Sequence, residues 1–229
     1  MLKVGLIAEG PTDLAVLENI LEGFIADDPV INFVQPKLRT DPGGWTLVFR
    51  ALRDGEARKA LQFNDVVVIQ IDTDVCEDVG FDVQRRAGGN ELSVAELVER
   101  VRERLVREMG STAQGLEGKL FFAVAVAVDG IECWLLPLLF ENEPTKAAKV
   151  TGCLAAANKK LDQLGRRRLC RADGTAKDVR AYEEASKDFR KQKALRGAAA
   201  NNPSLGLFLE NLAGLPANEP SENGDEEPA

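Results

Sequence analysis

The feature that most constrains the fold is a run of β-branched residues, V-V-V-I, at positions 66–69, with no polar residue between them. A strand this uniformly apolar is typical of the middle of a parallel sheet, where helices cover both faces. Shorter strand-like stretches occur at 2–8, 31–35 and 119–128. The sequence therefore predicts four strands that belong to one mainly parallel sheet.

Apolar residues recur with helical spacing between these strands, at 14–24, 45–61 and 93–109. Strands that alternate with helices imply right-handed crossover connections. Two further helical patterns, at 144–164 and 175–200, follow the last strand. The predicted class is α/β, with a mainly parallel central sheet flanked by helices and a helical C-terminal extension.

We divide the chain into an α/β domain at 1–140, a helical extension packed on it at 141–215, and an acidic tail at 216–229. The extension closes with a short amphipathic helix near 203–212. The tail is polar, and we expect it to be disordered. No signal peptide or apolar run of membrane-spanning length is evident, so we expect a cytoplasmic protein without a membrane anchor.

The chain contains no histidine, which excludes serine–histidine and cysteine–histidine catalysis and histidine-based zinc sites. Its four cysteines form no C-x-x-C pair, and in a cytoplasmic chain we expect free thiols. Carboxylates, lysines and hydroxyls remain for chemistry. Clustered carboxylates prefer hard cations, so the expected cofactor is Mg²⁺ or Mn²⁺.

Acidic residues follow three of the predicted strands. Glu9 follows the first strand, and Asp72 and Asp74 follow the third. Asp129 and Glu132 follow the fourth. Ligand sites in open parallel sheets lie beyond the carboxyl ends of the strands, and buried carboxylates repel one another unless a cation neutralises them. The sequence therefore predicts a divalent-metal site, with both aspartates of the D-x-D pair turned toward one ion.

Other acids near these strand ends carry weaker predictions. Asp13 can simply complement the dipole of the helix that it begins. Glu77 and Asp78 are further candidate ligands on the next loop. Asp65 precedes its strand and lies at the wrong edge of the sheet. A packing role for the apolar segment that follows Glu132 is an open alternative.

The net charge of −8 conceals a strong asymmetry. Residues 217–229 supply −5 of it, whereas residues 166–196 hold eleven basic residues against five acidic ones. Such a basic stretch suits an anionic partner, although it can also be an ordinary solvated face. We name Lys187 as the candidate catalytic cation of this stretch.

The order strand, Glu9-Gly10, helix, strand, helix, strand, Asp72-x-Asp74 resembles the TOPRIM domain of topoisomerases, bacterial primases and OLD-family nucleases. The motifs E-G-P-T-D at 9–13, I-E-C-W-L-L at 131–136 and N-P-S at 202–204 resemble small stand-alone OLD-family and RloB-like TOPRIM nucleases. Many of those proteins belong to bacterial phage-defence loci.

The resemblance implies a role for each matching residue. Glu9 is the expected general acid or base and a candidate metal ligand, and Asp72 and Asp74 are the expected magnesium ligands. Glu132 is a candidate ligand of a second metal.

The resemblance also implies a metal-dependent nuclease that cuts DNA or RNA, in anti-phage defence. Two alternatives stay open: another phosphotransfer or hydrolase reaction on a nucleotide, and a non-catalytic TOPRIM module that acts with a partner such as a separate ATPase subunit. A homo-oligomer is a further candidate partnership. The chain has no Walker lysine motif or G-x-G-x-x-G motif, which disfavours a P-loop or Rossmann site.

Overall fold

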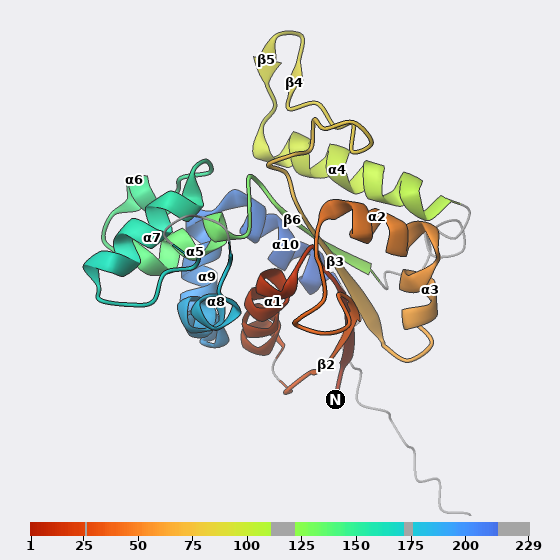
Figure 1. The fold of residues 1–229 in the computed structure, drawn as a ribbon, viewed down its shortest axis with the longest axis horizontal. Helices are drawn as coiled ribbons and strands as arrows, with labels where there is room; N and C mark the ends of the chain where they lie inside the picture. The colour runs from red at the N-terminus through yellow and green to blue at the C-terminus, as the bar shows by residue number, and fades with distance from the viewer. Residues whose placement is uncertain (26, 111–121, 172–175, 215–229) are drawn as a thin grey trace, which may run out of the picture.

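The computed structural model describes residues 1–25, 27–110, 122–171 and 176–214. In these residues a parallel sheet lies between two groups of helices (Figure 1). The elements in chain order are β1 (Lys3–Ile7), α1 (Pro11–Phe24), β2 (Val30–Gln35), α2 (Trp45–Arg53), α3 (Glu56–Ala60), β3 (Val66–Asp72), β4 (Arg86–Ala87), β5 (Asn90–Glu91), α4 (Val94–Met109), β6 (Phe122–Ala127), α5 (Glu132–Leu139), α6 (Pro144–Ala147), α7 (Cys153–Gln163), α8 (Val179–Ser186), the 3₁₀ helix η2 (Lys187–Arg190), α9 (Gln192–Asn201) and α10 (Pro203–Ala213).

The main sheet has four strands in the order β2-β1-β3-β6, and every neighbouring pair is parallel. The chain leaves β1 toward β2 on one side and then returns to place β3 on the other. This reversal creates a crevice between the carboxyl ends of β1 and β3, which is where open α/β sheets bind ligands. The predicted α/β class with a parallel central sheet is confirmed.

Alternate residues of the central strands enter two separate cores. Val66 and Val68 of β3 face a core built with α1 and the C-terminal helices. Val67 and Ile69 face a second core built with α2 and α4. This two-residue period explains why the strand is apolar throughout, as both of its faces are covered.

Three of the predicted helices are divided into shorter ones in the structure. The helix expected at 45–61 is interrupted at Gly55, whose φ of 71° is left-handed. Gly152, with φ 60°, separates α6 from α7 in the same way. The pattern at 175–200 becomes α8, η2 and α9. Left-handed backbone favours glycine and ends regular helix. The predictions of continuous helices at 45–61 and 144–164 were therefore wrong, and so was that of one helix at 175–200.

The C-terminal helices pack into the same core as α1 and α5. The ring of Trp134 stacks on Phe208 of α10 at 5.5 Å. Asn202 caps α10 by accepting a hydrogen bond from the backbone N–H of Leu205, and it donates to the carbonyl of Cys133. The N-P-S motif therefore fixes α10 against the beginning of α5. The tail predicted at 216–229 lies outside the described residues.

Cys133 and Cys153 form a disulfide that joins α5 to α7. The expectation of four free thiols was therefore wrong for this pair, because the packing of α5 on α7 brings their Cα atoms to 5.0 Å. Cys76 and Cys170 are free and buried, as expected. None of the helices in the described residues is long and apolar enough to cross a membrane.

Candidate functional site

Glu9 and Asp72 meet at the carboxyl ends of β1 and β3, which are adjacent strands. The backbone N–H of Asp72 donates to Glu9 Oε1 at 2.9 Å. Gln70 connects the same two residues from the side, because its Nε2 donates to Asp72 Oδ1 at 2.8 Å and its Oε1 accepts from the backbone N–H of Glu9 at 3.0 Å. The two carboxylates are therefore held by the sheet itself.

The turn after Glu9 is covered by a loop that needs glycine. A Cβ atom on Gly43 would lie 2.2 Å from the carbonyl oxygen of Glu9, so no side chain fits there. The N–H of Gly44 donates to that same carbonyl at 2.7 Å. This close approach fixes the position from which the Glu9 side chain leaves the strand.

Asp13, in the first turn of α1, is buried in the same region. Its Oδ2 accepts a hydrogen bond from the hydroxyl of Thr12 at 3.3 Å. Its Oδ1 is buried and has no hydrogen-bond partner among the described residues. An unpaired buried carboxylate oxygen is costly, so this atom points to a ligand or a proton rather than to simple capping.

Glu132, at the beginning of α5, is also buried and is bound by two C-terminal residues. The ammonium of Lys177 lies 2.8 Å from its Oε1. The hydroxyl of Tyr182, which is fully buried, donates to the same oxygen. The segment after Glu132 packs in the core, but Glu132 itself faces the acidic cluster.

A sharp turn at Asp129 and Gly130 brings Glu132 close to Asp72. Asp129 has φ 69°, and its backbone N–H donates to the hydroxyl of Thr73 at 2.9 Å. A Cβ atom on Gly130 would lie 2.7 Å from Glu132 Oε2 and 3.3 Å from Asp72 Oδ2. Glycine at this position therefore leaves room for two carboxylates from different strand ends.

Burial dominates the protonation of these acids. It raises the pKa of Glu9 to about 8, and the neighbouring charges of Asp13 and Asp74 add to the effect. Burial also raises the pKa of Asp13 to about 6 and that of Asp72 well above its ordinary value, and it raises the pKa of Asp74. The cluster therefore lacks the positive charge that would keep all of these carboxyl groups ionised.

Lys177 lines the acidic cleft together with Asp13 and Asp72, whereas Arg39, another cation of the lining, pairs with Glu18. Burial would lower the pKa of Lys177, but the charges of Glu132 and Asp13 outweigh this and raise it, so the lysine stays protonated. In return, burial of Glu132 is outweighed by Lys177 and Tyr182, which lower the pKa of that carboxyl. One ammonium therefore pairs with one of the acids and leaves the others uncompensated.

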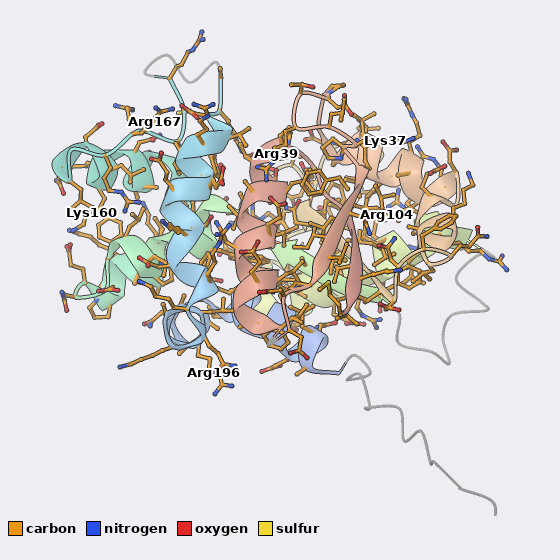
Figure 2. The ribbon with its side chains drawn as sticks, turned by 90° about the horizontal axis from the view of Figure 1, so that it is seen from below. Lys37, Arg39, Arg104, Lys160, Arg167 and Arg196 are labelled. Carbon is orange, nitrogen blue, oxygen red and sulfur yellow. A yellow bond between two sulfur atoms is a disulfide. The ribbon has the colours of Figure 1, made fainter. Side chains whose placement is uncertain are left out.

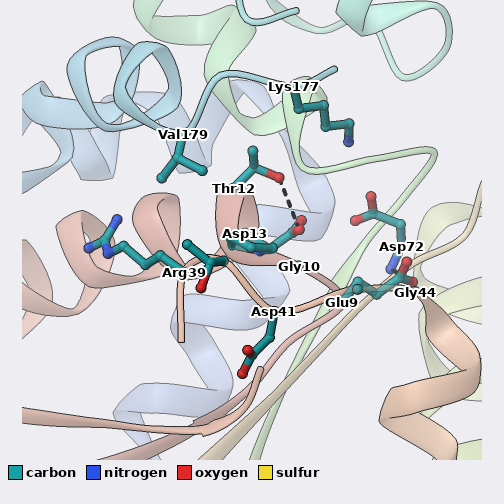
Figure 3. Close-up of a pocket in the computed structure, with 13 residues that line it drawn as sticks. Glu9, Gly10, Thr12, Asp13, Arg39, Asp41, Gly44, Asp72, Lys177 and Val179 are labelled. Atoms are coloured by element: carbon teal, nitrogen blue, oxygen red, sulfur yellow. Dashed lines mark hydrogen bonds between the residues drawn. The ribbon is translucent and has the colours of Figure 1, made fainter. Parts of the chain in front are cut away.

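The cleft itself has a volume of about 380 Å³. Figure 3 shows Glu9 and Asp72 together at one side, with Lys177 extending toward them and Arg39 and Asp41 farther away. The residues that line this acidic cleft are Glu9, Gly10, Pro11, Thr12, Asp13, Arg39, Thr40, Asp41, Gly43, Gly44, Asp72, Lys177 and Val179.

Two predicted site residues lie elsewhere. Asp74 is exposed and does not line the cleft, although its charge reaches Glu9 and Glu132. The two aspartates of the D-x-D pair therefore do not turn toward one point in this structure. Lys187 is exposed on η2 and is not a lining residue; Lys177 lies at the cleft instead.

The donor set of the cleft suits a hard divalent cation. Every candidate ligand is a carboxylate oxygen, which Mg²⁺ and Mn²⁺ prefer. The buried unpaired oxygen of Asp13 and the raised pKa of Asp72 both indicate that positive charge is lacking. Asp72, which lines the cleft, and Glu132, whose Oε2 lies near it across Gly130, would hold such an ion, with Glu9 beside them.

The acids do not, however, converge as tightly as a preformed site. Among the described residues, three candidate ligand atoms lie within 4.8 Å of one another only at Asp129, Cys133 and Cys153. The two sulfur atoms of that group are joined in the disulfide, so they offer no thiolate. The carboxylate cluster would therefore have to contract around an ion.

Sequence reasoning missed three contributors to this site. Gln70 reads as part of an apolar strand, and a buried glutamine within such a strand is the signal that could have identified it. Lys177 and Tyr182 reach Glu132 from far along the chain, fifty residues in the case of the tyrosine. No local pattern signals such a contact.

No protein-family model matches the chain, and comparisons with curated proteins and with solved structures yield no match.

Proposed function

We propose that the protein is a metal-dependent nuclease that hydrolyses phosphodiester bonds of DNA or RNA. The observation that carries the proposal is the group of carboxylates from Glu9, Asp13, Asp72 and Glu132 at the crevice between β1 and β3, where Lys177 pairs with Glu132. Such a group is costly to bury without a cation, and a cation beside an open cleft suits a phosphate substrate.

The residues divide into two roles under this proposal. Asp72 and Glu132 would hold Mg²⁺ or Mn²⁺, while Asp74, which does not line the cleft, would contribute its negative charge from nearby. The bound ion supplies Lewis-acid stabilisation of the phosphate and a water of lowered pKa. Holding the ion requires the carboxyl of Asp72 to lose its proton.

Glu9 is suited to move a proton. Its pKa of about 8 lets it exist in both protonation states near neutral pH, which is the condition for an efficient general acid or base. Its Oε1 is fixed by the backbone N–H of Asp72, so its second oxygen is the one available to a water or a leaving group. Lys177 supplies positive charge at the same cleft.

The resemblance to stand-alone TOPRIM nucleases supports this assignment, because Glu9, Asp72 and Asp74 match the residues of that motif. The parallel sheet, with its reversal between β1 and β3, supports it as well. On the same resemblance we extend the proposal to a role in anti-phage defence.

A cleavage assay tests the proposal. Plasmid DNA, single-stranded DNA and tRNA are incubated with wild-type protein and Mg²⁺ or Mn²⁺, and with the variants Glu9→Gln and Asp72→Asn. Asp65→Asn is the matched control, since Asp65 stands at the opposite end of β3 and bonds the N–H of Lys3. We expect cleavage by the wild type and the control and at least a hundredfold loss in the two site variants. A wild type that binds but cuts no substrate, or site variants that cut as well as the control, would refute catalysis.

A further inference from the structure

A second cleft, of about 510 Å³, adjoins the acidic one. The two clefts share Lys177 and Val179 in their walls. The second cleft is basic: its lining residues are Arg167, Arg168, Cys170, Arg171, Ala176, Lys177, Asp178 and Val179. Nothing in the proposed hydrolysis uses these arginines.

Backbone hydrogen bonds fix the wall that carries the basic residues. The backbone N–H of Arg171 donates to the carbonyl of Ala176 at 3.0 Å, and that of Asp178 donates to the carbonyl of Leu169 at 2.8 Å. Cys170 and Lys177 form an antiparallel bridge between these bonds. The short pairing therefore sets Arg171 and Lys177 in one wall.

The cleft has more positive charge than its own acids neutralise. Arg167 pairs with Asp178 at 3.1 Å, and Arg168 pairs with Asp162 at 2.9 Å. Arg171 has no side-chain partner among the described residues. The Nε of Arg168 is buried and likewise has no hydrogen-bond acceptor in the described part of the chain. An unsatisfied guanidinium nitrogen beside an arginine that has no side-chain partner in the described ranges suits an oxyanion.

We propose that this basic cleft binds a second backbone phosphate of the nucleic acid, next to the acidic cleft where cleavage takes place. The inference rests on the proposed function, and it adds a binding site for a phosphate that flanks the cleaved one. A chain with successive phosphates can occupy both clefts across Lys177, whereas a mononucleotide can occupy only one. Planar guanidinium groups suit phosphate geometry, and contacts with phosphate carry no direct sequence information.

The chain offers a matched control for this site. Arg196 belongs to the same basic segment, is exposed on α9, and has no ion-pair partner among the described residues. Figure 2 shows Arg167, which lines the basic cleft, near the top of the view and Arg196 near the bottom. Arg171→Glu and Arg196→Glu therefore change the total charge equally but alter different surfaces.

The test is binding of a fluorescein-labelled 20-nucleotide single strand, followed by fluorescence anisotropy in EDTA at several salt concentrations. EDTA removes divalent cations, so the result does not depend on cleavage. We expect Arg171→Glu to weaken binding about tenfold at 50 mM salt and to reduce the slope of log K against log salt by about 0.7, the value for one phosphate contact of a single strand. Arg196→Glu should change the affinity less than twofold, and millimolar AMP should compete poorly.

Equal losses of affinity in Arg171→Glu and Arg196→Glu would overturn the phosphate site and show only a general charge effect. Absence of wild-type binding at 50 mM salt would overturn it too, as would efficient competition by AMP. Arg171→Gln, which keeps a polar side chain, should have an affinity between those of the wild type and Arg171→Glu. Unchanged melting temperatures of all variants exclude misfolding. A wild type that binds in this way but cuts nothing would refute the proposed nuclease and leave the phosphate site in place.

Discussion

Raising the pH should destabilise the metal-free protein, because Glu9 is harder to ionise in the folded state than in the unfolded state. Burial raises the pKa of this carboxyl from 4.5 to about 8. Between these pH values the folded protein keeps a proton that the unfolded chain has lost. The unfolding free energy therefore falls as the pH rises toward 8, and it is highest on the acidic side of this window.

The magnitude follows from the window between pH 6 and pH 8. Each pH unit across which only the folded state is protonated costs about 1.4 kcal/mol. Since Glu9 is itself half ionised at pH 8, it accounts for about 2 kcal/mol across this window. For a chain of this length that corresponds to a fall in Tm of roughly 4–9 °C. Asp72, whose pKa is also raised by burial, changes stability in the same direction. Glu132 does not oppose it here, because its lowered pKa acts only below about pH 5.

Thermal melts in EDTA, followed by circular dichroism at pH 6, 7 and 8, measure this effect. Glu9→Gln should reduce the fall in Tm, since the amide does not titrate. Mg²⁺ at about 100 times its Kd should restore about 2.7 kcal/mol at pH 8. A change in Tm of less than 2 °C across the window, or an equal fall in Glu9→Gln, would refute the reasoning.

Three further changes test the packing around the site. Gly23→Ala places a Cβ atom 1.8 Å from the carbonyl oxygen of Phe189 and should lower the unfolding free energy, measured with urea, by about 3 kcal/mol. The helical control Gly197→Ala, with nothing within 4 Å of the new Cβ, should be neutral or stabilising. Equal effects of the two variants would contradict the packing of α1 on η2. Reduction of the Cys133–Cys153 disulfide, which spans 20 residues, should lower the unfolding free energy by about 3 kcal/mol. A melting temperature that reductant does not change, or changes equally in the variant with both cysteines replaced by serine, would contradict the bond. Lys177→Met should cost only about 1 kcal/mol, because the lysine side chain is 43% exposed, yet lower the cleavage rate at least tenfold; unchanged cleavage would remove Lys177 from the site.

The sheet was predictable because its strands carry strong local signals. The apolar run in β3 and the helical spacing in α1 and α4 each correspond to an element within a few residues. The capping box at Ser93 and Glu96 shows why α4 begins where the pattern predicts. The helices expected at 45–61 and 144–164 were predicted too long, because Gly55 and Gly152, in left-handed conformations, break patterns that are otherwise continuous.

The site was predictable only in the part that the sheet determines. Parallel strands place Glu9 and Asp72 at one edge, and that follows from the order of the elements. The buried position of Asp13 and the pairing of Lys177 with Glu132 depend on how the C-terminal helices fold back on α1 and α5. Such contacts between distant segments leave no local pattern, which is why Lys187 was named in place of Lys177.

The carboxylate cluster as a hard-cation site is tested most directly by titration with Mn²⁺, with the free ion followed by electron paramagnetic resonance. The wild type should bind Mn²⁺ more tightly at pH 8 than at pH 6, because protons on Glu9 and Asp72 compete with the ion. Asp72→Asn should weaken binding at least tenfold, and Asp65→Asn, at the other end of the same strand, should leave it unchanged. Absence of Mn²⁺ binding by the wild type at millimolar concentration, or equal binding by Asp72→Asn, would contradict the account.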